Sequence, residues 1–198
     1  MKRMTIDLDE YVYTADRKFR GAVSVEHFPL DPREWENVGR MICPNRKYSL
    51  GDKHDLNLEE CNSWDEVREV IQSAGGVLIL PLGLYDHSGI SMYIGNSHDR
   101  WDGGQVGFIY VTQDDLDREG LTIEQAEQRL RDEVKVYDAY LTGNVYRFDV
   151  WQEVSACECG QCKEWESVEC NSDYIDATEA EKDMRDLLSK FETEEVKA

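Results

Sequence analysis

The sequence contains no apolar run that approaches the roughly 20 residues needed to span a bilayer. Its first residues, Met1 to Asp7, also lack an apolar stretch behind the basic pair Lys2-Arg3, which argues against a secretory signal peptide. We therefore expect a cytoplasmic protein that has no membrane partner.

Positive charge is scarce as well. The chain has 22 Lys and Arg residues against 42 Asp and Glu residues, a formal net charge of −20, and its longest basic cluster is Asn45-Arg46-Lys47. Phosphate binding depends on clustered Lys and Arg, so direct binding of DNA or RNA is not expected. An acidic surface can instead bind a basic protein or occupy a nucleic-acid-binding groove as a phosphate mimic. The same charge is also explained by solubility alone or by adaptation to a salt-rich cytosol.

Hydrophobic residues make up 40% of the 198 residues and include ten Tyr and five Trp, which suits a single domain with a buried core. Apolar alternation and short apolar runs predict strands at 22–28, 77–85, 90–94, 106–112, 145–154 and 165–170. Three capping boxes predict helix starts, at Ser63 with Glu66, at Thr122 with Gln125 and at Thr178 with Glu181.

These elements predict an α+β fold, in which an antiparallel meander sheet is packed by two to three helices and a small C-terminal hairpin carries cysteines. We expect residues 1–150 to form an acidic α+β core domain. Residues 151–198 are then the cysteine hairpin and a C-terminal helix, both packed on that core.

Four of the six cysteines lie within fourteen residues, at Cys157, Cys159, Cys162 and Cys170. In a chain without a secretion signal, such clustering indicates metal or redox chemistry before structural disulfides. Four thiolates suit a structural zinc ion, and Gly160 would allow a tight turn between them. A hairpin joining residues 145–154 to 165–170 would bring Cys170 near that turn. The alternative is a set of free thiols on an exposed loop.

Histidines flanked by carboxylates occur in polar loops. The candidates for a catalytic or metal-binding role are His54, Asp86, His87 and Asp102, with His98 nearby in the sequence. Imidazole and carboxylate groups can hold a divalent metal whose bound water attacks a substrate, or act as an acid–base pair. The alternative for residues 85–89 is a plain turn, in which Asp86 and Ser88 bond to the backbone and Gly89 supplies a positive φ.

Four sequence blocks occur in a characteristic order: residues 33–41 leading to 50–52, residues 82–89, residues 101–111 and residues 137–146. Together they resemble a family of uncharacterised proteins from phages, plasmids and conjugative elements, and the resemblance covers roughly residues 25 to 150. It implies a genomic context rather than an activity. An accessory gene of a mobile element commonly serves host takeover or counter-defence.

The leading functional hypothesis is therefore a non-enzymatic accessory protein that binds a host protein with a basic surface. One alternative is a metal-dependent hydrolase or nuclease-like enzyme that uses the His and Asp loop residues. Another is a small zinc-stabilised regulatory module built on the four clustered cysteines.

Overall fold

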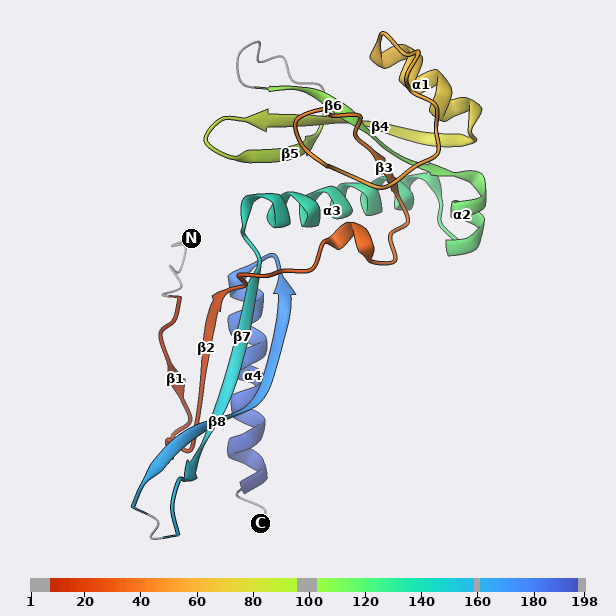
Figure 1. Ribbon diagram of the computed structural model, residues 1–198. Coiled ribbons are helices and arrows are strands. Elements are labelled where there is room, and N and C mark those ends of the chain that lie inside the picture. Colours follow the sequence, from red (N-terminus) through yellow and green to blue (C-terminus); the bar gives the residue numbers. More distant parts are fainter. Residues whose placement is uncertain (1–7, 96–102, 159–160, 196–198) are drawn as a thin grey trace, which may run out of the picture. The chain divides into compact units, whose positions relative to one another are not determined.

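The computed structural model describes residues 8–95, 103–158 and 161–195 (Figure 1). The chain forms two compact units, a central unit of Asp31–Thr142 and a terminal unit that combines Met1–Leu30 with Gly143–Ala198. This division differs from the one expected at residue 150. The reason is that a strand near the N-terminus pairs with a strand that follows residue 145, so the two ends of the chain belong to one unit.

The central unit is built on a four-stranded antiparallel sheet in the order β3-β6-β4-β5. Its strands are β3 (Arg40–Ile42), β4 (Gly76–Asp86), β5 (Ile90–Ile94) and β6 (Gly103–Thr112). Strand β6 is buried from Val106 to Thr112, as the continuous apolar run predicts for a strand that is covered on both faces. At Gly107 a Cβ atom would lie 1.9 Å from the carbonyl oxygen of Ile42, so the close approach of β3 requires glycine there.

Helices cover both faces of this sheet (Figure 1). The helical elements are η1 (Pro32–Glu34), α1 (Trp64–Ser73), α2 (Gln113–Glu119) and α3 (Ile123–Thr142). Helix α3 packs Leu130 and Val134 into a core with Ile109, whereas α1 packs Val67 and Ile71 against the opposite face. Apolar residues recur along α3 at spacings of three and four residues, so one face of the helix is buried along its length.

A buried ion cluster connects the segment before β3 to helix α3. The side chain of Arg33 is only 4% exposed, and its guanidinium lies 2.8 Å from the Asp52 carboxylate and 3.1 Å from that of Glu133. Its Nη2 also donates to the carbonyl oxygen of Gly39 at 2.7 Å, and the Glu133 carboxylate accepts from the amide of Val38. Burial works against the charged form, but hydrogen bonds and charges of Asp52 and Glu133 raise the pKa of Arg33 above its ordinary value. With its charges paired in this way, the cluster has a structural role.

The terminal unit has a second antiparallel sheet, in the order β1-β2-β7-β8, which we call the terminal sheet. Its strands are β1 (Val12–Tyr13), β2 (Phe19–Val25), β7 (Tyr146–Ser155) and β8 (Lys163–Tyr174), and its helix is α4 (Ala177–Glu195). Helix α4 packs Ala180, Met184 and Leu188 on one face of this sheet. A Cβ atom at Gly21 would come within 2.7 Å of the Met184 side chain, so glycine allows the helix to lie close.

The α+β class is confirmed, but the strands form two separate sheets rather than one meander. The predicted capping box is formed, because the amides of Thr122 and Gln125 each donate to the side-chain oxygen of the other residue. Gly143 has the expected left-handed conformation with φ 72°. The N-cap predicted at Thr178 is wrong by two residues, since α4 begins at Ala177 and the carboxylate of Asp176 accepts from the amide and hydroxyl of Thr178. No helix within the described ranges is long and apolar enough to span a membrane.

Candidate functional site

Asp86, one of the predicted catalytic residues, lies at the end of β4 and is already paired. Its carboxylate accepts from Nζ of Lys47 at 2.7 Å and from the hydroxyl of Tyr48 at 3.0 Å. The hydrogen bond from Lys47 holds the pKa of Asp86 below its usual range, and the same contact raises the pKa of Lys47. Asp86 therefore remains a charged anion at neutral pH and is a poor general base.

His87 occupies the turn that joins β4 to β5. Its amide donates to the carbonyl oxygen of Gly89 at 3.1 Å, and the two following residues have positive φ angles, 58° at Ser88 and 153° at Gly89. The ring of His87 lies beside that of Tyr85, with 6.2 Å between their centroids. These features match the turn alternative, with the difference that Asp86 bonds to side chains rather than to the backbone.

Among the described residues, His54 does not line the same hollow as Asp86. A polar hollow of about 330 Å³ is lined by Asp86 and residues 103–106 of β6 and by no histidine of the described segments, while His54 lines a different pocket. Asp102 and His98 fall outside the described residues. Within the described part of the chain, no group of three or more His, Cys, Asp or Glu side chains is placed to hold a metal ion. The hydrolase hypothesis stays a prediction.

The clustered cysteines are spread along the β7–β8 hairpin. Cys157 is disulfide-bonded, whereas Cys162 and Cys170 are free and exposed, and Cys159 falls outside the described residues. Cys170 pairs with Asp149 in the middle of the strands, so the expectation that it lies near the turn is wrong. It lies eight positions after Cys162, which precedes β8, and eight steps of extended chain span about 26 Å at 3.3 Å per residue. The structural zinc ion itself stays a prediction.

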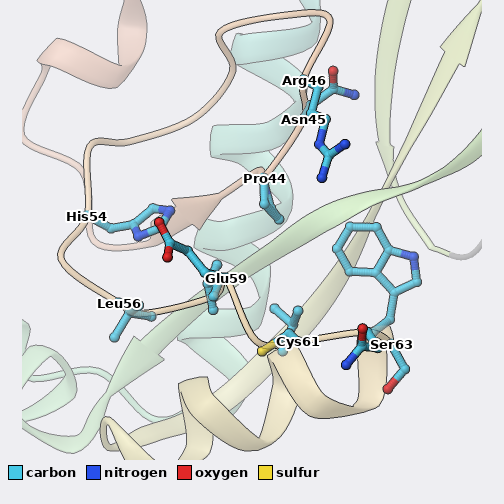
Figure 2. A pocket seen from close by; sticks show the side chains of 12 residues that line it. Pro44, Asn45, Arg46, His54, Leu56, Glu59, Cys61 and Ser63 are labelled. Carbon is cyan, nitrogen blue, oxygen red and sulfur yellow. The ribbon is translucent and has the colours of Figure 1, made fainter.

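The larger of these two hollows lies beside helix α1, and we call it the α1 pocket (Figure 2). It has a volume of about 570 Å³ and is lined by residues 44–46, by residues of the loop from 54 to 63, and by Trp64 and Val67 of α1. Leu56, Leu58 and Val67 belong to the hydrophobic cluster beneath it and form an apolar floor. Its polar lining includes His54, Glu59 and Asn45.

Exposed carboxylates dominate the chain segment that forms this pocket. Between residues 55 and 69 there are six acidic side chains and one basic side chain, Arg68, which lies over the ring of Phe108 at 5.2 Å. The acidic residues are Asp55, Glu59, Glu60, Asp65, Glu66 and Glu69. Arg46 adds one cation to the lining of the pocket. The chain segment that forms the pocket thus combines an apolar floor with six exposed carboxylates, of which Glu59 lines the pocket itself.

A second surface, which the sequence analysis missed, lies on the face of the terminal sheet opposite α4. We define the arginine–aromatic cluster as Tyr11, Tyr13, Arg20, Trp151 and Trp165. Arg20 pairs in register with both Tyr13 and Trp151, and directly paired residues of an antiparallel sheet point to the same face. Phe19 and Gly21 on either side of Arg20 face α4, so Arg20 faces away from it. Strand alternation could have placed Arg20 on one face, but not beside these aromatic residues.

No protein-family model matches this chain, and no curated protein or solved structure matches it.

Proposed function

We propose that the chain is a non-enzymatic binding protein that captures a basic region of a protein partner at the α1 pocket. In the context that the sequence resemblance implies, it is an accessory protein of a phage or mobile element and the partner is a host protein. The observation that carries the proposal is the combination of an apolar floor with exposed carboxylates in one segment of the chain.

The floor of the pocket supplies short-range binding energy. Leu56, Leu58 and Val67 offer apolar surface to an inserted side chain, and burial of such surface contributes about 25 cal/mol per Å². The stem of a Lys or Arg side chain is apolar while its head is charged, so it can cover the floor and still reach a carboxylate at the rim. A cavity of about 570 Å³ is large enough for one such anchor residue.

The acidic surroundings supply attraction over a longer range. The net charge of −20 accelerates encounter with a basic partner and repels partners of high negative charge density such as nucleic acids. Because exposed charges are screened over about 8 Å at physiological ionic strength, complex formation of this kind weakens steeply as salt is added.

The first experiment uses the tagged chain as bait in a lysate of its host, with washes at increasing salt and identification of retained proteins by mass spectrometry. The expected result is a stoichiometric partner with a basic surface, which is released as the salt concentration rises. A partner that stays bound at high salt, or one whose binding surface is acidic, contradicts the proposal.

Two charge-matched double variants then locate the contact. Glu59→Gln with Glu60→Gln removes two carboxylates beside the pocket, and Asp117→Asn with Asp132→Asn removes two exposed carboxylates from α2 and α3. We expect the first pair to weaken binding about three- to tenfold, because exposed ion pairs contribute about 0.2–1 kcal/mol each. The second pair should change affinity less than about twofold. Equal losses for the two pairs would mean that the whole acidic surface, and not the pocket, selects the partner.

A further inference from the structure

We infer that the arginine–aromatic cluster of the terminal sheet is a docking site for an acidic peptide segment of a protein partner, in which one carboxylate pairs with Arg20. This goes beyond the proposed function, because the cluster lies in the terminal unit and selects the opposite charge.

Arg20 has no acceptor among the residues that the structure describes. Its Nε is buried without a hydrogen-bond partner. Other cations on the same face are neutralised within the chain, since Arg147 pairs with Asp149 and Lys163 pairs with Glu153. A guanidinium is always charged and carries five N–H donors, and a buried donor without an acceptor is unfavourable. Arg20 is thus a charged donor that can gain binding energy from an incoming acceptor.

The aromatic rings hold the guanidinium in place. Its Cζ lies 4.0 Å from the ring centroid of Tyr11, 4.4 Å from that of Trp165 and 5.4 Å from that of Trp151. Cation–π contacts leave the N–H groups of a guanidinium available as donors, and because Nε is buried, an incoming acceptor reaches the terminal Nη1 and Nη2 groups. A carboxylate binds such groups through two parallel hydrogen bonds. The cluster is therefore preorganised for a planar anion.

The charges around the cluster favour a single carboxylate over a nucleic-acid strand. Arg17, which lies over the ring of Tyr13 at 4.6 Å, is a second cation without a described ion pair. However, the carboxylates of Asp149 and Glu153 lie on the same face of the sheet as the cluster, and the whole chain has a net charge of −20. A phosphate backbone would have to pass these carboxylates, which disfavours it. An acidic side chain of a peptide needs to meet only Arg20.

The exposed aromatic area beside Arg20 indicates a protein segment rather than a small carboxylic acid. Tyr11 and Tyr13 are 42% and 38% exposed, so their rings offer apolar surface to residues that flank the acidic one. Surfaces rich in Trp, Tyr and Arg are typical of the centres of protein interfaces. The expected occupant is an acidic residue with apolar or aromatic neighbours.

Selection of short random peptides displayed on phage, with the full chain as target, tests this inference. We expect the enriched peptides to share one Asp or Glu at a fixed position with apolar or aromatic neighbours. The best peptide is then synthesised in two forms, one with the acidic residue and one with the corresponding amide, Asn or Gln. The affinity of each form for the chain is measured by fluorescence polarisation. Replacing the acid by its amide should lower affinity about tenfold or more, and so should Arg20→Gln. The two changes together should cost little more than either one, because both remove the same interaction.

Arg185→Gln is the matched control, because Arg185 lies on the exposed side of α4 in an ion pair with Glu181 and should not affect peptide affinity. If Arg20→Gln fails to fold, the acid-to-amide change in the peptide still decides the question on the unaltered protein. Three outcomes overturn the inference: no enrichment, enriched peptides without a fixed acid, or Arg20-dependent binding of a short oligothymidylate that is tighter than that of any selected peptide. The variants at Glu59 and Glu60 leave this surface intact, so the two proposals can fail separately.

Discussion

Arg33→Met should destabilise the central unit by about 3 kcal/mol, because it leaves two carboxylates without the cation that they share. The side chain of Arg33 is 4% exposed, and the side chains of Asp52 and Glu133 are 24% and 12% exposed. Loss of one partner of a buried ion pair costs about 3–5 kcal/mol, and the partial exposure of Asp52 places the value at the lower end. The carbonyl oxygen of Gly39 also loses its donor. Met is chosen because it keeps most of the apolar stem of Arg.

Urea unfolding followed by circular dichroism measures the loss as a lower midpoint with an unchanged slope. The matched control is Arg131→Met on α3, where an exposed Arg pairs with Glu127 one helical turn away. This control should cost only about 0.3–0.5 kcal/mol, because solvent screens exposed pairs. The ratio between the losses of unfolding free energy in the two variants therefore isolates the effect of burial on an arginine ion pair.

The double variant Arg33→Met with Glu133→Gln should be less destabilised than the sum of its single variants, since the charge that lacks a partner is removed. A cost below about 1 kcal/mol for Arg33→Met, or one equal to that of Arg131→Met, would refute the view that this cluster holds the central unit together.

Three further predictions follow from single positions. Asp115→Asn should cost about 1–3 kcal/mol at pH 7, because the buried carboxylate accepts from the amide and hydroxyl of Thr112. Although burial acts in the opposite direction, these bonds and the neighbouring arginines lower the pKa of Asp115 below its ordinary value of 3.8. The stability that the ionised Asp115 carboxylate contributes is thus present above that value and is lost as the pH falls through the folded-state pKa. The urea midpoints of the Asp115→Asn variant and the wild type should therefore converge only below about pH 4. Gly107→Ala should lower stability by about 3 kcal/mol through its clash with Ile42, while Gly104→Ala in the same strand, which meets open space, should change it by less than about 0.5 kcal/mol in the same assay. Burial, followed by the charge of Asp52, raises the pKa of Cys43 to about 12, so in native protein at pH 8 iodoacetamide should alkylate the exposed Cys162 and leave Cys43 unmodified, as peptide mass mapping can show.

The sequence by itself determined the features that depend on neighbouring residues. The helix that starts after Thr122 and ends before Gly143 was predicted at both ends, because its cap, its apolar period and its stop signal all lie within the element. Helix α2 was missed because it has only seven residues and its cap is completed by Asp115 rather than by Glu or Gln. At the start of α4, Asp176 competed with Thr178 for the role of cap, and the carboxylate accepts the bonds.

Only the tertiary structure decided which strands pair and which side chains meet. The period of two places Arg20 on one face of its strand, but pairing with β7 about 130 residues later is what sets it beside Trp151. In the same way, Arg33 meets Glu133 across 100 residues of sequence, and Cys170 lies in the middle of a strand because the hairpin is longer than its apolar pattern predicts. Local patterns specify what each residue prefers, whereas contacts between distant residues depend on which apolar faces the whole chain can bury together.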